Sequence, residues 1–93
     1  MKAIYNGKTI AESQNTKVVE GNHYFPPDSI NEEYFTPSGH TTTCHWKGVA
    51  NYKNIEVEGK VNKNGAWQYN DPKPAASGIK GYYAFWNGVE TTG

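Results

Sequence analysis

Short runs of β-branched and aromatic residues, separated by glycine, proline and asparagine, recur along the whole chain. Residues 2–5 and 8–12 are two such runs around Asn6-Gly7, a pair that suits the positive φ angles of a two-residue hairpin turn. Residues 81–91 repeat this arrangement around Asn87-Gly88. The pattern therefore predicts a hairpin at each end of the chain.

Further strands are predicted between these hairpins. They cover residues 16–20, 40–46, 49–52, 55–61 and 66–69. Within 55–61, apolar Ile55 and Val57 alternate with Glu56 and Glu58, which is typical of a half-buried strand. The polar residues 62–65 supply turn chemistry before the next strand.

One short helix interrupts the predicted strands. Ser29 is followed three residues later by Glu32, which matches a capping box and predicts a helix near residues 30–35, closed by Pro37. Because 93 residues suffice for one core, we expect a single domain spanning residues 1–93. The predicted fold class is all-β, with mainly antiparallel sheets in a tent-like or sandwich-like arrangement.

The composition narrows the classes of partner. The chain has no Leu and no Arg, and its nine Lys balance nine acidic residues, so no net charge gathers a polyanion or an anionic membrane surface. Nucleic acid and membrane are therefore not expected as partners. The single cysteine cannot form an internal disulfide, and the N-terminal residues lack the apolar run of a secretion signal, which favours the cytoplasm.

Four stretches, taken in order, are similar to one known family. They are Val19-Glu20-Gly21 leading into Tyr24-Phe25-Pro26, Thr43-Cys44-His45-Trp46-Lys47-Gly48 with Ala50 and Tyr52, Ala66-Trp67-Gln68-Tyr69 with Pro72, and Ile79-Lys80-Gly81 with Ala84-Phe85. Over nearly the whole chain, their order and spacing resemble the domain of unknown function 427 family. This resemblance implies antiparallel sheets around an aromatic cluster, packed like the Mss4 and cereblon ligand-binding domains. Those domains carry zinc between two Cys pairs, which this chain lacks.

The same family is also labelled a nucleotidyltransferase-like domain. Metal-dependent nucleotidyl transfer needs closely spaced carboxylates that hold two cations. The chain has only two Asp, Asp28 and Asp71, each in a proline-rich loop, and the acidic pairs at 32–33 and 56/58 are better explained as exposed surface. The residues therefore do not support the nucleotidyltransferase label.

Cys44 and the three histidines are the candidate reactive or metal-binding groups of the chain. Because neighbours on a strand point to opposite faces, Cys44 and His45 should not meet, and Cys44 is better explained as a small core residue. His23 and His40 lack the regular short spacings of a zinc site. We expect no metal and no cofactor, while a reactive thiol at Cys44 stays open.

The aromatic residues give the strongest functional indication. Tyr and Trp carry polar tips that need partners, so several of them should line a partly wet cleft of the kind that binds small molecules. The predicted ligand-binding residues combine the family stretches with usable chemistry: Glu20, Tyr24, Lys47, Tyr52, Trp67 and Tyr69. The favoured function is binding of a small ligand or a peptide end. An enzyme that uses Cys44 or Lys47 and a protein-interaction domain are the alternatives, and a monomer or weak dimer is expected.

Glu20 and Lys47 pose a separate structural question. If Val18 packs inward, strand alternation carries the Glu20 carboxylate inward as well, where it needs a cation. Lys47 is the predicted partner, because the following Gly48 lets the backbone bend. The alternative is two separate surface charges, since the many charged residues allow casual pairings.

Overall fold

The computed structural model describes residues 1–93, which form nine strands and three short 3-10 helices. The strands are β1 (Lys2–Tyr5), β2 (Lys8–Glu12), β3 (Lys17–Val19), β4 (Asn22–Tyr24), β5 (Phe35–Cys44), β6 (Gly48–Val57), β7 (Lys60–Gln68), β8 (Tyr83–Phe85) and β9 (Glu90–Thr92). The 3-10 helices are η1 (Pro27–Ser29), η2 (Glu32–Tyr34) and η3 (Pro74–Ile79). The predicted all-β class is confirmed.

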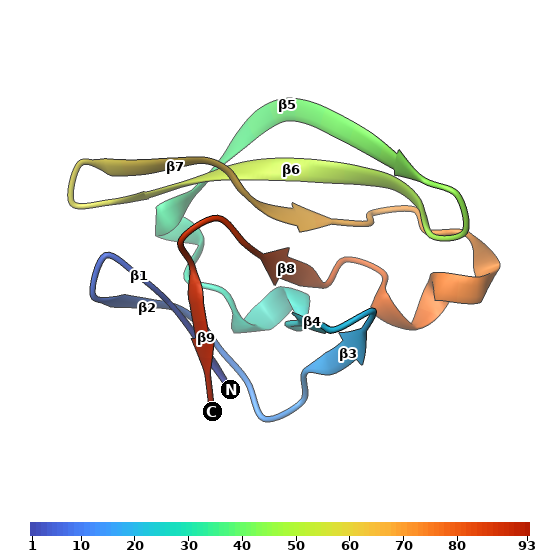
Figure 1. Ribbon diagram of the computed structural model, residues 1–93, viewed down its shortest axis with the longest axis horizontal. Helices are drawn as coiled ribbons and strands as arrows, with labels where there is room; N and C mark the ends of the chain where they lie inside the picture. The colour runs from blue at the N-terminus through green and yellow to red at the C-terminus, as the bar shows by residue number, and fades with distance from the viewer.

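The strands form three antiparallel sheets, in the orders β2-β1-β9, β3-β4 and β5-β6-β7-β8. The long hairpin of β5 and β6 covers one side of the molecule, and the smaller sheets lie opposite it (Figure 1). Phe25, directly after β4, exchanges two backbone hydrogen bonds with Tyr83 in β8. This bridge ties the β3-β4 hairpin to the large sheet.

The two predicted terminal hairpins had different outcomes. The first is confirmed, because β1 pairs with β2 around Asn6 and Gly7, both of which have positive φ. At the other end, Asn87 and Gly88 also have positive φ, but the strands on either side separate. Strand β8 pairs with β7, and β9 pairs with β1, so the two ends of the chain meet in one sheet (Figure 1). The predicted C-terminal hairpin was therefore wrong.

The middle of the chain also differs from the prediction. Residues 49–52 and 55–61 were expected as separate strands, but β6 runs unbroken to Val57 and turns at Glu58-Gly59. The Asn-Gly pair at 64–65 lies inside β7, beside a register shift in the β6-β7 pairing. There the amide N–H of Asn64 donates to the Asn54 side chain at 2.9 Å. The positive φ of Asn64 therefore belongs to a β-bulge within β7 and not to a hairpin turn.

The predicted helix near residues 30–35 is a single 3-10 turn, η2, and the capping box does not form. The Ser29 hydroxyl donates to the carbonyl of Pro26 at 2.7 Å. Asn31 occupies the N-cap position without a capping hydrogen bond, and its side-chain amide donates to the carbonyl of Thr9 instead. Pro37 does not close a helix; it lies in β5, where an edge strand tolerates the missing amide donor.

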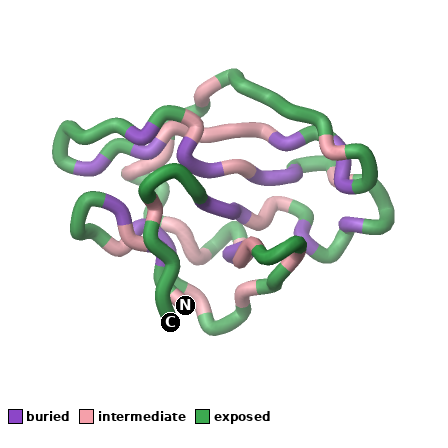
Figure 2. The backbone as a smooth tube through the Cα atoms, in the orientation of Figure 1, coloured by how far each residue is buried: buried purple, intermediate pink, exposed green.

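Two apolar clusters form the interior (Figure 2). The first lies between the terminal sheet and the large sheet and contains Ala3, Tyr5, Ile10, Ala11, Phe25, Ile55, Val57, Ala66, Tyr83 and Phe85. The second lies where β4, β6, β8, η3 and the end of β7 meet and contains Tyr24, Ala50, Tyr69, Ala76, Ile79 and Ala84. Aromatic rings supply the volume that leucine usually provides. None of the chain's helices has the length and apolar character needed to cross a membrane.

Candidate functional site

Lys47 lies in the turn between β5 and β6 and is almost completely buried, with 5% of its surface exposed. Its ammonium pairs with the carboxylate of Glu20. The same nitrogen lies 5.2 Å from the ring centre of Trp46 and 5.6 Å from that of Tyr69, which are cation–π distances. The predicted partner of Glu20 is therefore the observed one.

The route by which Glu20 reaches Lys47 differs from the expected one. Val18 points outward and is 60% exposed, so strand alternation does not carry Glu20 inward. Instead, Glu20 and Gly21 have φ angles of 53° and 80° and form the tight turn between β3 and β4. From this turn the carboxylate contacts Lys47 with one oxygen and accepts from the Trp46 indole N–H at 3.4 Å with the other.

The pKa values of the pair move apart. Hydrogen bonds from Lys47 and then from Trp46 lower the pKa of the Glu20 carboxyl below its ordinary value. Burial is the largest single influence on the pKa of Lys47 and acts to lower it. The hydrogen bond to Glu20 and the nearby Tyr24, Tyr69 and Cys44 groups together outweigh burial, so the pKa of Lys47 is raised. Both shifts favour the charged forms, so the ion pair is kept through neutral pH.

Two tyrosines pack beneath this pair. Tyr24 is fully buried, its ring centre lies 6.5 Å from that of Tyr69, and its hydroxyl accepts from the Trp67 indole N–H at 3.2 Å. Burial raises the pKa of Tyr24, and it raises the pKa of Tyr69 to about 12. Both phenols therefore stay protonated at neutral pH, where they can donate and accept hydrogen bonds.

Tyr52 joins the same set from the neighbouring strand. Its ring centre lies 6.2 Å from that of Trp67, and its hydroxyl lies 3.1 Å from the Thr42 hydroxyl. All six predicted ligand-binding residues thus form one continuous series of contacts, which we call the Lys47 network: Glu20, Lys47, Tyr69, Tyr24, Trp67 and Tyr52. The structure brings the six together, although several of them are interior residues and do not form an open cleft.

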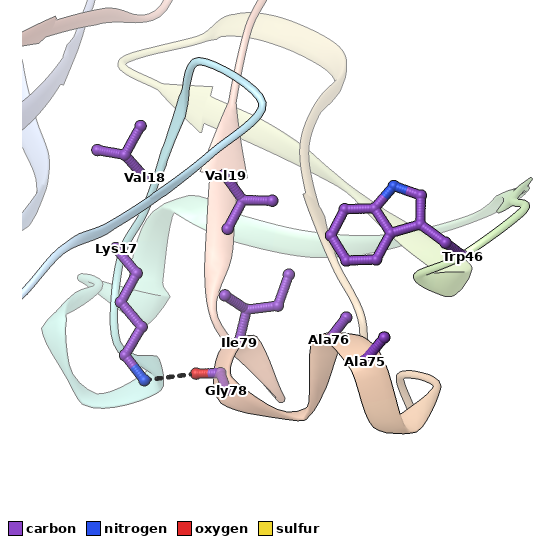
Figure 3. Close-up of a pocket in the computed structure, with 8 residues that line it drawn as sticks. All are labelled: Lys17, Val18, Val19, Trp46, Ala75, Ala76, Gly78 and Ile79. Carbon is purple, nitrogen blue, oxygen red and sulfur yellow. Dashed lines mark hydrogen bonds between the residues drawn. The ribbon is translucent and has the colours of Figure 1, made fainter.

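An open cavity lies directly beside the Lys47 network. This cavity, the Trp46 pocket, has a volume of about 270 Å³ and is lined by Lys17, Val18, Val19, Trp46, Ala75, Ala76, Gly78 and Ile79 (Figure 3). None of the six predicted residues lines it. It adjoins the network through Val19, which precedes Glu20, and through Trp46, which precedes Lys47.

Sequence reasoning missed this pocket because its walls are ordinary aliphatic residues from three separate segments. The available signal was the position of Trp46 beside Lys47 in a family-like stretch. In the structure, Trp46 and Val18 are exposed large apolar side chains, 38% and 60% exposed, and both belong to this pocket.

A second hollow of about 350 Å³ is mainly polar. It is lined by Pro37, Gly39, His40, Thr41, Asn51, Tyr52, Lys53, Gln68 and Asn70. Tyr52 is its single member from the predicted site, and the ring of His40 lies against it with 4.8 Å between centres. The two hollows have different chemistry, one apolar with an aromatic wall and one polar.

Cys44 is partly buried at the end of β5 and packs against the second apolar cluster, as a small core residue was expected to do. Burial acts to raise the pKa of its thiol, but the backbone amides of Lys47 and Trp46 act against burial, and the net shift is downward. His45 is exposed, and His23 lies near Thr16. Nowhere do three or more His, Cys, Asp or Glu side chains converge as metal ligands would.

The fold and these contacts define a small all-β domain with an enclosed lysine network beside an apolar pocket. The chain belongs to the family described as domain of unknown function DUF427, whose model matches residues 1–92. The resemblance of its four sequence stretches to that family is thereby confirmed. The family model also bears the label NTP_transf_9. No curated protein matches the chain.

Proposed function

We propose that this domain binds a small molecule, or the end of a peptide, in the Trp46 pocket. The observation that carries the proposal is the double role of Trp46. One part of its indole forms a wall of the apolar pocket, and its N–H reaches the Glu20 carboxylate at 3.4 Å. A ligand in the pocket would therefore lie against a side chain that the ion pair of Lys47 and Glu20 holds in place.

The Trp46 pocket and the Lys47 network have different roles in this proposal. The pocket, with its aliphatic walls, receives an apolar group, and its volume of about 270 Å³ has room for a single ring or a branched chain. Glu20, whose side chain is 53% exposed, does not line the pocket and acts through its contact with the Trp46 indole. Lys47, Tyr24, Tyr69 and Trp67 act behind the rim as supports that fix the positions of Glu20 and Trp46.

This arrangement follows a general requirement of binding sites. Holding a side chain in its bound conformation before the ligand arrives reduces the ordering cost of binding. The indole of Trp46 would otherwise be free to rotate, because it sits in a turn and is more than one-third exposed. Its contact with Glu20 and the position of Lys47 over its ring limit that freedom.

A comparison of two tryptophan variants tests the proposal. A library of small ring-containing fragments is screened for binding, and the affinity of each hit is then measured on Trp46→Ala and Trp86→Ala. Trp86 is also exposed, at 51%, but lies outside the pocket. We expect Trp46→Ala to weaken binding about tenfold or more and Trp86→Ala to leave it unchanged.

The same experiment contains the results that would refute the proposal. If no fragment binds, the domain is not a small-ligand module, and the protein-interaction alternative gains support. If fragments bind but Trp46→Ala has no effect, binding occurs elsewhere, and the polar hollow at Tyr52 becomes the next candidate site.

An enzymatic use of Cys44 is the second candidate, favoured by the lowered pKa of its thiol beside Lys47. Its test is the rate of alkylation by iodoacetamide as a function of pH. An enzymatic thiol should react with a midpoint below 9 and faster than a free cysteine at neutral pH, and Lys47→Met should raise the midpoint. A reaction slower than that of free cysteine at every pH would assign Cys44 to the core alone.

A further inference from the structure

The inference made here rests on the proposed function and concerns the charge of the ligand. Lys17 lies at one edge of the Trp46 pocket, on β3, where its side chain extends along the rim toward η3 (Figure 3). Its ammonium donates a hydrogen bond to the carbonyl of Gly78 at 2.6 Å. It also lies 5.0 Å from the ring centre of Tyr82. Two contacts from different elements thus fix this cation at the rim.

No carboxylate neutralises the Lys17 ammonium. The ion pairs of the chain are Lys8 with Glu58 and Lys47 with Glu20, and neither includes Lys17. An ammonium has three hydrogen-bond donors, and Gly78 takes one of them. The remaining two donors are available to a ligand.

The charges around the pocket therefore leave one positive charge unmatched. Lys47 and Glu20 cancel each other beside Trp46, while Lys17 stands alone at the rim. We infer that the pocket is built for a ligand with an apolar ring or branched chain and one carboxylate, whose oxygens take the free donors of Lys17. A cationic ligand would instead place two like charges together at the rim.

The positions of Trp46 and Lys17 in the pocket fit a ligand with an apolar part and a separate carboxylate. Trp46 and Lys17 come from different segments and lie on different sides of the hollow, with Val19 and Ile79 between them (Figure 3). A ring held against the indole would leave its carboxylate on the side of Lys17. A free organic acid and the C-terminal residue of a peptide both provide this chemistry.

Three probes that share one phenylpropyl skeleton and differ in the charge of the head group test the inference: 3-phenylpropionate, 3-phenylpropanol and 3-phenylpropylamine. We expect the carboxylate to bind about three to ten times more tightly than the alcohol, and the amine to bind most weakly. Added salt should reduce the advantage of the carboxylate, because the rim is open to solvent. An N-acetylated dipeptide ending in phenylalanine, compared with its C-terminal amide, distinguishes a peptide end from a free acid.

Two lysine variants provide the matched control. Lys17→Met should remove the preference for the carboxylate while the alcohol still binds. Lys80→Met changes the net charge by the same amount outside the pocket and should leave the preference intact. Both positions are exposed, so both variants should fold normally.

The outcomes separate this inference from the proposed function. If the three probes bind equally, or the amine binds most tightly, the inference about charge is wrong and the binding function stands. If Lys17→Met keeps the preference for the carboxylate, a different cation recognises the ligand and the assignment to Lys17 fails. If no probe and no fragment binds, both the inference and the proposed function fail.

Discussion

The Lys47 ammonium is enclosed by the fold, while the Glu20 carboxylate that pairs with it stays half exposed. The two side chains are 7% and 53% exposed. Water can therefore solvate Glu20 if Lys47 is lost, but it cannot reach Lys47 as easily if Glu20 is lost. This asymmetry makes the pair directly testable.

We predict that Glu20→Gln lowers the free energy of unfolding more than Lys47→Met does. The first change leaves a buried ammonium without its counter-charge, whereas the second leaves a carboxylate that water reaches and solvates. The double variant should recover part of the loss. Urea denaturation of the wild type, the two single variants and the double variant measures the coupling free energy between Glu20 and Lys47 in a double-mutant cycle. Glu58→Gln, from the exposed pair with Lys8, is the control and should cost less than ~0.5 kcal/mol. Simple additivity of the two single changes would contradict the pairing.

The turn backbone provides a second prediction, because Glu20 and Glu58 have nearly the same φ, 53° and 50°, and each precedes a glycine. Asparagine tolerates this left-handed conformation better than glutamate. Glu58→Asn should therefore stabilise the domain slightly, by about 0.5 kcal/mol. Glu20→Asn gains the same backbone preference but loses the partner of Lys47, so we expect a lower melting temperature. Equal effects at the two positions would show that Glu20 has only a turn role.

The pH dependence of stability follows from the two pKa shifts. Folding lowers the pKa of Glu20. The stability that the ionised carboxylate adds to the fold is therefore fully present above the ordinary pKa of 4.5, and it is lost as the pH falls through the folded-state pKa. Folding raises the pKa of Lys47. The stability that its ammonium adds to the fold is therefore fully present below the ordinary pKa of 10.5, and it is lost as the pH rises through the folded-state pKa. The stability difference between wild type and Glu20→Gln should therefore be constant near neutral pH and shrink at both extremes. Thermal unfolding across this range checks the result, and a constant difference down to pH 2 would contradict it.

Trp67 and Trp46 should contribute differently to the stability of the fold. It is partly buried, packs against Tyr24, Tyr52 and Trp86, and donates to the Tyr24 hydroxyl. We predict that Trp67→Ala reduces the free energy of unfolding by about 3 kcal/mol, because it removes packing and a hydrogen-bond donor together. Trp46→Ala should cost about 1 kcal/mol or less, since its side chain lies on the surface. A stable Trp67→Ala protein that no longer binds fragments would instead place Trp67 in the site.

Local turn chemistry explains how much of the fold could be predicted. The first hairpin followed from Asn6-Gly7, where residue preference and pairing agree. The Asn-Gly pair at 64–65 was misread as a turn, because the same positive φ also suits a bulge within a strand. The real turn uses Glu58-Gly59, and glutamate is rarely found at this position. Pairing between distant segments, such as β1 with β9, leaves no local sign in the sequence.

The candidate site also has one part that the sequence predicts and one part that it does not. The convergence of Glu20 and Lys47 could be predicted because both lie in family-like stretches and carry opposite charge. The expectation that Val18 points inward and carries Glu20 with it was wrong. Val18 is exposed, and Glu20 lies in a turn and does not follow the alternation of the strand. The Trp46 pocket could not be predicted, since β3, η3 and the turn before β6 supply its walls only after folding.

The three tryptophans allow the central claim to be measured in one experiment, because each indole N–H reports on a different place. Trp46 lines the pocket, and Trp67 lies in the Lys47 network. The Trp86 indole N–H donates to the carbonyl of Asn64 outside the pocket, while the Trp86 ring packs against Trp67. The measurement is a titration of ¹⁵N-labelled protein with 3-phenylpropionate, followed through the three indole signals. The proposed function predicts a large, saturable shift of the Trp46 signal, a smaller shift of Trp67 and no shift of Trp86. A signal of Trp46 that stays fixed while the others move, or three signals that never move, would contradict it.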